Sequence, residues 1–287
     1  MDRRLPENIA GRQTMNSVAE FSVLMSLYAK EQPEFLTQCL HSLQQQTLPA
    51  TEIIIVFDGS IGKELQQCVA QFAHTLPIRV CPLPENVGLA KALNHGLAHC
   101  RCEWVLRMDT DDICVPERFV KQWAFLQQYP DLAISGGLTA EFSRTPNCID
   151  AVKTVPLTHN EIMRYSRKRN PFNHMTVAYR KTAVLAVGGY RHHLFMEDYQ
   201  LWLRLLAAGY RSGNLPEVLV YARAGQAMYR RRRGWRYVKS EWQLCCIKQQ
   251  LHFQAALPAL FTFVARSAGR LLPETLLARV YRRLRKH

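Results

Sequence analysis

Residues 107–116, which read Arg-Met-Asp-Thr-Asp-Asp-Ile-Cys-Val-Pro, decide how this chain folds. An apolar strand leads into the stretch, and its final proline opens a helix. The carboxylates of Asp109, Asp111 and Asp112 crowd the turn between them and repel one another unless a cation or a donor lies among them. Hard oxygen ligands at a strand end suit Mg²⁺ or Mn²⁺, usually bridged to a substrate phosphate. The same pattern also occurs as a solvated helix cap, so the rest of the sequence has to decide.

Strands and helices alternate through the first part of the chain. The apolar runs predict strands over 21–28, 53–57, 78–81 and 104–108. The segments between them carry apolar residues at helical spacing, as in Leu89, Leu93 and Leu97. This rhythm predicts an α/β fold with a Rossmann-like, mostly parallel sheet covered by helices. Ligands of such sheets bind at the carboxyl ends of the strands.

The second half of the chain is less regular. Residues 131–157 predict short strands and loops, and a late strand is expected over 215–221. Helical patterns then fill 234–254 and much of 257–286. From residue 273 onward the pattern is amphipathic, with an apolar face and an arginine-rich remainder. This suits a helix lying in an anionic lipid interface, and it also suits a helix docked on the core with a solvated basic side.

The composition is typical of a globular protein, but the charge is unevenly distributed along the chain. The 287 residues are 48% hydrophobic, enough for a sizeable core. Residues 222–287 hold 15 Lys and Arg against two Glu, which accounts for +13 of the net charge of +14. A basic C-terminal region on a nearly neutral globule indicates an anionic surface as partner, either membrane or nucleic acid.

Several classes of protein are disfavoured by what the sequence lacks. No apolar run approaches the roughly 20 residues that span a bilayer, and the first 20 residues lack the apolar centre of a signal peptide. The nine cysteines are scattered without a Cys-x-x-Cys pair, which favours reduced thiols in a cytoplasmic protein. No Gly-x-Gly-x-x-Gly follows the first strand and no Walker A motif is present, which disfavours dinucleotide enzymes and P-loop NTPases.

Seven segments, in order along the chain, resemble family 2 glycosyltransferases, which have the GT-A fold. The segments are 21–28, 39–47, 53–60, 85–90, 107–116, 170–176 and 197–202. The resemblance is closest to bacterial members that build exopolysaccharide, O-antigen or lipooligosaccharide chains. It implies an N-terminal extension over 1–20, a GT-A catalytic domain over 21–233 and a basic helical C-terminal region over 234–287. Within the catalytic domain it implies a nucleotide-binding half over 21–116 and an acceptor half over 117–233.

The resemblance implies a metal-dependent, inverting transfer of a hexose or N-acetylhexosamine from a UDP-sugar to a growing surface glycan. It assigns a nucleotide-sugar site to Ser26, Tyr28, Asp58, Asn86, Gly88, Lys91 and Asp109. Tyr28 would stack on the uracil and Asp58 would accept its N3–H, whereas the loop that begins at Asn86 would cover the uridine and diphosphate. The sequence departs from the family's usual residues at Ser26 and at Lys91, where an arginine is common.

The same resemblance assigns the chemistry. Asp111, with Asp109, would hold Mn²⁺ or Mg²⁺ against the leaving diphosphate. Asp198 would be the catalytic base, and Glu197 would position the base or the acceptor. His174 matches an element near the acceptor. Arg231 and Arg232 lie where the family has a flexible basic loop, which would close over the diphosphate or face a membrane.

Structural roles stay open beside these functional ones. Tyr28 also fits the cap of a core strand, Asp58 an Asx-turn, and Glu197 and Asp198 acids at a helix start. Two other functions stay open as alternatives: a sugar-phosphate nucleotidyltransferase, and a non-enzymatic basic nucleic-acid-binding protein. We expect a lipid-linked or oligosaccharide acceptor, no specific nucleic acid, and a peripheral place on the inner face of the cell membrane. The sequence does not identify the sugar, the accepting hydroxyl or the oligomeric state.

Overall fold

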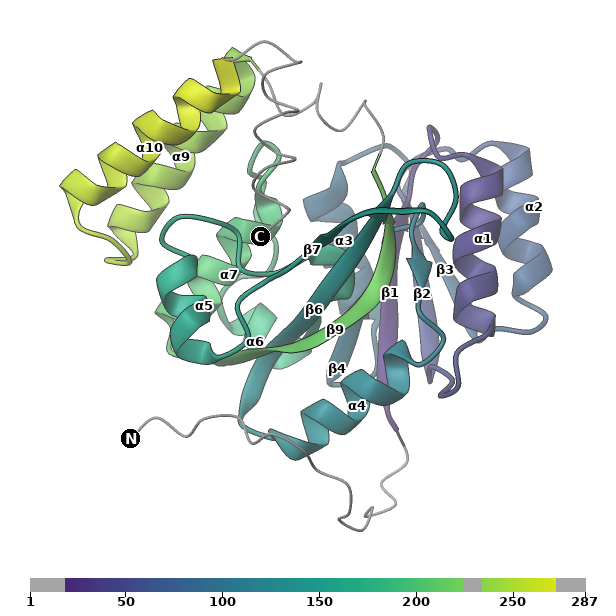
Figure 1. Ribbon diagram of the computed structural model, residues 1–287. Coiled ribbons are helices and arrows are strands. Elements are labelled where there is room, and N and C mark those ends of the chain that lie inside the picture. Colours follow the sequence, from purple (N-terminus) through teal and green to yellow (C-terminus); the bar gives the residue numbers. More distant parts are fainter. Residues whose placement is uncertain (1–18, 225–233, 272–287) are drawn as a thin grey trace.

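The computed structural model describes residues 19–224 and 234–271. Its centre is a nine-stranded sheet with the order β3-β2-β1-β4-β8-β6-β9-β5, and β7 pairs with β6 (Figure 1). The predicted α/β fold is confirmed. The sheet as a whole is mixed, because its first four strands are parallel and most of the later pairs are antiparallel.

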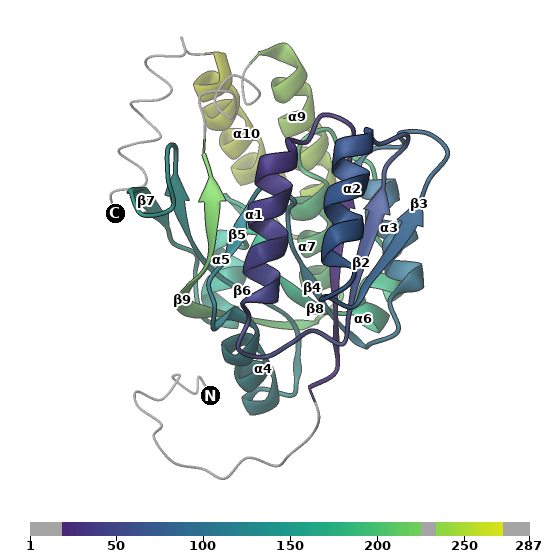
Figure 2. The same ribbon diagram turned by 90° about the vertical axis from the view of Figure 1, so that its right-hand side faces the viewer.

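The parallel half of the sheet follows the predicted rhythm closely. Its strands are β1 (Phe21–Leu27), β2 (Glu52–Phe57), β3 (Ile78–Pro82) and β4 (Trp104–Arg107). Its helices are α1 (Pro33–Gln44), α2 (Lys63–Phe72) and α3 (Leu89–His99). Successive side chains of a strand point to opposite faces of the sheet. Val23 and Met25 therefore pack with α1 and α2, whereas Leu24 packs with α3 on the other face (Figure 2).

The second half of the sheet differs from the prediction. We expected short strands and loops over 131–157, and this was wrong, because β6 (Leu132–Phe142) is an 11-residue strand. It is buried on both faces and therefore lacks alternation, and the pair Gly136 and Gly137 also interrupts its apolar run. Gly137 lies where β6 and β9 approach closely, since a Cβ there would be 2.5 Å from a methyl carbon of Leu219.

The remaining strands complete this half. They are β5 (Ile113–Cys114), β7 (Ile149–Lys153), β8 (Ala178–Arg180) and β9 (Arg211–Arg223). β8 pairs antiparallel with β4 and joins the two halves, and β5 returns from the end of β4 to pair with the end of β9. The turn after β4 is therefore held between the first strands of the sheet and its last strand.

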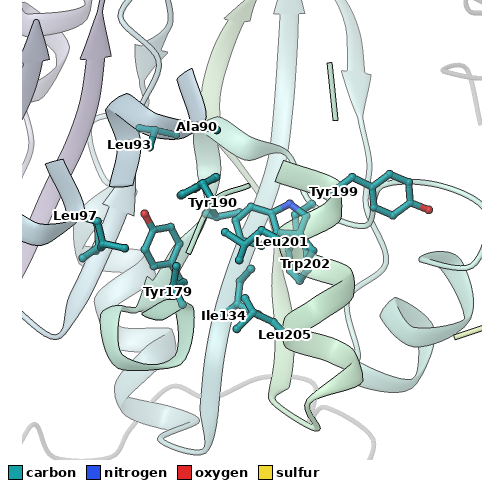
Figure 3. Close-up of a cluster of buried hydrophobic side chains, with 14 of the residues drawn as sticks. Ala90, Leu93, Leu97, Ile134, Tyr179, Tyr190, Tyr199, Leu201, Trp202 and Leu205 are labelled. Carbon is teal, nitrogen blue, oxygen red and sulfur yellow. The ribbon is translucent and has the colours of Figure 1, made fainter. Parts of the chain in front are cut away.

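Four α-helices and a turn of 3₁₀ helix lie around this half. They are α4 (Arg118–Gln128), α5 (His159–Tyr165), η1 (His174–Thr176), α6 (Lys181–Ala186) and α7 (Glu197–Ala207). α7 is the most buried of them. Its Leu201, Trp202 and Leu205 belong to the same core cluster as Tyr179 and Tyr190 (Figure 3). The start of α7 is therefore fixed relative to the sheet.

The chain continues into a helical hairpin. α9 (Trp235–Gln250) and α10 (Ala256–Leu271) pack side by side, and α9 also contacts α7 (Figure 1). None of the helices that the structure describes is long and apolar enough to cross a membrane. The predicted amphipathic segment from residue 273 onward lies outside the described residues, as do Arg231 and Arg232.

Candidate active site

The carboxyl ends of β1, β2 and β4 meet at one edge of the sheet, and the predicted site residues follow them. Tyr28 comes directly after β1, Asp58 after β2, and residues 109–112, here called the carboxylate turn, after β4. The loop after β1 touches the turn, because the Thr110 hydroxyl donates to the Glu31 carboxylate over 2.6 Å. The sheet thus brings together groups that are 79 residues apart in the sequence.

Asp58 joins the end of β2 to the start of α3. One carboxylate oxygen accepts the backbone N–H of Val87 over 2.7 Å. The other accepts the side-chain amide of Asn86 over 3.0 Å and the N–H of Gly88 over 3.2 Å. Gly59 makes this close approach possible, because its φ is +88° and a Cβ would lie 2.6 Å from the backbone nitrogen of Asn86. Asp58, Asn86 and Gly88 thus form one structural unit, and the uracil contact of Asp58 stays a prediction.

Three other predicted nucleotide-binding residues surround this unit. Tyr28 is 41% exposed, so its ring is available for stacking. Ser26 is half-buried in β1, and Lys91 is exposed in the first turn of α3. Their positions are compatible with the predicted roles, which stay predictions.

Arg107 controls the first carboxylate of the turn. Its side chain is only 1% exposed, and its guanidinium donates to Asp109 over 2.5 Å. Burial by itself would raise the pKa of Asp109, but the charge and hydrogen bond of Arg107 outweigh it and hold that pKa below its usual range. Asp109 is therefore an anion that already has a cationic partner.

The other two carboxylates of the turn differ from Asp109, because the pKa of each is raised. Burial, followed by the charges of Asp109 and Glu31, raises the pKa of Asp111 to about 6. Burial, followed by the neighbouring carboxylates, raises the pKa of Asp112 well above its usual value, and Asp112 accepts the backbone N–H of Arg223 over 2.8 Å. Asp112 thus has a structural role, whereas Asp111 is an anion whose charge lacks a full counterion.

Arg223 is a site residue that the sequence did not reveal. Its guanidinium donates to the backbone carbonyl of Asp111 over 3.0 Å and to the Gln38 side chain over 2.9 Å. It also lies 3.8 Å above the Phe35 ring. We had counted Arg223 with the basic C-terminal region, but it is the last residue of β9 and holds the carboxylate turn from a distance of 112 positions in the sequence.

The predicted base, Asp198, lies in the first turn of α7. The side-chain amide of Asn170 donates to one carboxylate oxygen of Asp198 over 2.6 Å. Burial, followed by the charge of Asp198, raises the pKa of Glu197 to about 7, and Asp109 and Arg107 also act on it. Asn170 was missed as a site residue, although it begins a segment on which the family resemblance rests.

The side chain of His174 is held by contacts with neighbouring aromatic residues. Its Nε2 is 3.0 Å from the Tyr190 hydroxyl, and its ring packs on Trp202. Burial, followed by the charge of Arg107, lowers the pKa of His174 to about 4, so the ring is neutral at pH 7. Its predicted contact with the acceptor stays a prediction.

Comparisons with known proteins decide the family. The model of glycosyl transferase family 2 matches residues 22–194. The chain belongs to glycosyl transferase family 2. It is 52% identical over 262 residues to an uncharacterized glycosyltransferase of Haemophilus influenzae, covering 91% of this chain and 97% of that one.

Two further relatives of this glycosyltransferase have more specific names. The amylovoran biosynthesis glycosyltransferase AmsE of Erwinia amylovora is 46% identical over 266 residues, with 93% of this chain and 99% of that one covered. The UDP-Gal:alpha-D-GlcNAc-diphosphoundecaprenol beta-1,3-galactosyltransferase of Escherichia coli is 36% identical over 270 residues, with 92% and 96% covered. Membership of this family leaves no support for the nucleotidyltransferase and nucleic-acid-binding alternatives.

Solved structures confirm the GT-A fold of the glycosyltransferase. Staphylococcus aureus TarS 1–349 in complex with UDP-GlcNAc matches with a TM-score of 0.64 at 19% identity, covering 86% of this chain and 72% of that chain. The mannosyltransferase PcManGT of Pyrobaculum calidifontis in complex with GDP-Man and Mn²⁺ matches with a TM-score of 0.61 at 18% identity, covering 95% and 82%. At these identities the comparison shows the fold alone.

The carboxylate turn of the glycosyltransferase fits a divalent cation that the substrate helps to hold. Among residues 19–224 and 234–271, no group of three or more His, Cys, Asp or Glu could hold a metal by itself. Asp111 nevertheless offers a hard oxygen ligand whose raised pKa a nearby cation would relieve. A Mg²⁺ or Mn²⁺ ion bound by one or two carboxylates and completed by substrate phosphates is the usual arrangement for such a site.

Proposed function

We propose that this glycosyltransferase moves a hexose or N-acetylhexosamine from a UDP-sugar to a growing bacterial surface glycan, with inversion at the anomeric carbon. The observation that carries the proposal is the pairing of two acidic groups. Asp111 is an incompletely compensated anion after β4, and Glu197 and Asp198 begin α7, where the charge of Asp109 from the same turn acts on Glu197. One group suits a metal and diphosphate, and the other suits an attacking hydroxyl.

In the proposed reaction the acceptor hydroxyl attacks the anomeric carbon from the face opposite the diphosphate. The bond between this carbon and the acceptor oxygen forms as the bond to the phosphate oxygen breaks, and the electron pair leaves with UDP. Asp198 takes the hydroxyl proton from a distance of about 2.6–3.2 Å. The amide of Asn170 fixes one oxygen of Asp198, which leaves the other to face the acceptor.

The other residues of the site have supporting roles in this proposal. Mn²⁺ or Mg²⁺, held by Asp111 with Asp109, would supply positive charge at the diphosphate when bound. Glu197, with a pKa of about 7, can carry a proton at neutral pH and donate a hydrogen bond to the acceptor. Tyr28, Asp58 and the loop before α3 would hold the uridine.

The acceptor is proposed to be lipid-linked, as the name of the Escherichia coli relative states for that enzyme. The enzyme would then work on the inner face of the membrane. The excess of Lys and Arg in residues 222–287 supports an anionic surface as its partner there. The part of this region beyond residue 271 lies outside the described residues.

A donor screen tests the proposal. UDP release would be measured from a panel of UDP-, GDP- and dTDP-sugars with Mn²⁺, for the wild type and Asp198→Asn. We expect turnover with a UDP-sugar, and a kcat at least about a hundredfold lower in Asp198→Asn with UDP-sugar affinity within a few-fold, because the proton moves only in the transition state.

Two results would contradict the proposal. Turnover with GDP- or dTDP-sugars alone would overturn the donor class. A folded Asp198→Asn enzyme with full activity would move the base to Glu197, the next carboxylate at the start of α7.

A further inference from the structure

Helix α10 is amphipathic, but its polar face is buried and its apolar face is exposed. Its polar side chains Ser267 and Arg270 are buried against the rest of the protein. Its large apolar side chains point outward, with Leu257 81% and Phe261 76% exposed. We call Leu257, Leu260, Phe261 and Val264 the outward face, because all four are exposed and recur at helical spacing. A helix of a globular protein normally buries such a stripe, so this one needs a partner.

Charged contacts fix this orientation. Glu241 of α9 is buried and accepts two hydrogen bonds from Arg266 over 2.7 and 2.8 Å, and two from Arg270 over 3.1 and 3.3 Å. Arg266 also donates to the backbone carbonyl of Lys168 over 2.9 Å. Turning α10 to bury its apolar stripe would break these contacts and leave Glu241 buried without its counterions. The ion pairs with Glu241 therefore keep the outward face exposed.

A basic cavity lies beside the turn that connects α9 to α10, next to the first residue of the outward face. It has a volume of about 560 Å³. The exposed cations Arg164, Arg167 and Lys168 line it, together with His252, Phe253 and Pro258 from the hairpin. Pro258 follows Leu257, the first residue of the outward face. Three cations around a cavity of this size suit a phosphate group.

We propose that the outward face of α10 lies in the interface of an anionic membrane and that the basic cavity takes the phosphate headgroup of an anionic phospholipid. Apolar residues beside a cluster of Lys and Arg are the pattern of interfacial binding. Trp242, half-exposed on α9 and in contact with Phe263, adds an aromatic side chain of the kind found at the membrane interface. A second copy of the chain fits less well, because a net charge of +14 on each copy would oppose self-association.

This inference rests on the proposed function for its purpose, since a lipid-linked acceptor stays at the membrane. The hairpin is tied to the loop that leads into α7. The Ser240 hydroxyl donates to the carbonyl of Leu194, and the His193 ring lies 3.0 Å from the carbonyl of Ser240. These contacts connect α9 of the hairpin to the residues just before α7, the helix that carries Asp198.

Vesicle co-sedimentation tests the inference on the full-length protein. The vesicles contain phosphatidylcholine with or without phosphatidylglycerol and no lipid-linked sugar, so that binding reports the phospholipid itself. We expect Leu257→Glu/Phe261→Glu to weaken binding at least about tenfold, because two apolar side chains leave the interface. Leu260→Gln/Val264→Gln should act in the same direction. Val120→Glu/Leu185→Glu is the matched control on exposed apolar residues of α4 and α6, and it should bind like the wild type.

The cavity has its own variant. Arg164→Glu/Arg167→Glu should abolish the preference for phosphatidylglycerol, and Lys63→Glu on α2 should keep it. Sedimentation of both outward-face variants like the wild type would overturn the inference. The inference would also be overturned if the wild type formed a dimer in solution and did not bind vesicles, and if these variants were monomers. UDP affinity is measured on every variant, because it reports the proposed nucleotide site and should be unchanged whether or not the membrane surface is real.

Discussion

At the scale of single residues, the site is built by giving similar side chains different surroundings. Asp109, Asp111 and Asp112 lie in one turn, yet only Asp109 has an arginine side chain as ion partner and only Asp112 accepts a backbone N–H from β9. Asp111 is left with a raised pKa, which is the condition for a cation ligand. A cation beside Asp111 would relieve the repulsion from Asp109 and Glu31 that contributes to this raised pKa.

Glu197 allows a test of these surroundings through stability. Its pKa of about 7 lies above the ordinary value of about 4.3. A carboxyl with a raised pKa stabilises the fold when protonated, and this contribution is lost as pH rises through about 7. Glu197→Gln should therefore raise the free energy of unfolding at pH 8 by on the order of 1–3 kcal/mol and change it little at pH 4.

Urea unfolding at the two pH values measures this difference. Glu34→Gln is the control, since Glu34 is an exposed acid in the first turn of α1. An equal effect of Glu197→Gln at both pH values would contradict the raised pKa.

The residues that the sequence did not reveal share one cause. Arg107 belongs to the decisive stretch itself, but its burial and its bond to Asp109 depend on how the strands pack. Arg223 reaches the carboxylate turn across the sheet, and Asn170 reaches Asp198 from another segment. A sequence shows which residue types are present, whereas these contacts exist only after the sheet closes.

At the scale of elements, the success of the prediction depended on the continuity of the apolar pattern. β1, β2, β3, β4 and the helices between them were predicted because each helix has one apolar face and each strand ends at a turn signal. β6 is buried on both faces like β1 and β2, but it was missed because a glycine pair interrupts its apolar run. The late strand was predicted too short, since β9 continues to Arg223. The site lies at the predicted strand ends, and its far wall lies in the half that was predicted least well.

Gly59 tests how the elements position the nucleotide loop. Gly59→Ser places a side chain at a φ of +88° and against the backbone of Asn86. It should lower the free energy of unfolding by on the order of 1–3 kcal/mol and weaken UDP binding, because the loop before α3 must move. Gly62→Ser is the control, since Gly62 has a φ of −58°, nothing lies within 4 Å of its Cβ position, and serine is a good helix cap.

Thermal unfolding and UDP calorimetry on the two variants measure this prediction. If Gly59→Ser were as stable as Gly62→Ser, the close approach of the two loops would not matter in solution.

At the scale of the whole molecule, the positive charge is divided between internal contacts and the exposed surface. The sequence predicted a basic region that faces an anionic partner. The structure turns part of it inward, because Arg223 holds the carboxylate turn and Arg266 and Arg270 neutralise Glu241. Lys248 is also buried, and burial lowers its pKa to about 7. Part of the charge of the basic region thus stabilises the fold. Exposed cations elsewhere in the chain, such as Arg164 and Arg167, are free to face an anionic partner.

Two truncations separate these roles. A chain ending at Ala255 loses the packing of α10 on α9 together with Arg266 and Arg270, the ion partners of Glu241, which should cost about 3–5 kcal/mol. A chain ending at Leu271 keeps α10 and both arginines, so it should retain this stabilisation. Urea unfolding measures both, and vesicle binding of the second shows whether residues 272–287 act as an anchor. Equal stability of the two truncated chains would contradict the structural role of Glu241.

The central claim is that the carboxylate turn binds a nucleotide diphosphate through a divalent cation, and UDP calorimetry tests it most directly. UDP affinity would be measured with Mn²⁺ and with EDTA for the wild type, Asp111→Asn and the exposed control Asp150→Asn. We predict that Mn²⁺ tightens UDP binding at least about tenfold in the wild type and the control, and that Asp111→Asn loses most of this gain. Equal UDP affinity of the wild-type protein with Mn²⁺ and with EDTA would contradict the claim.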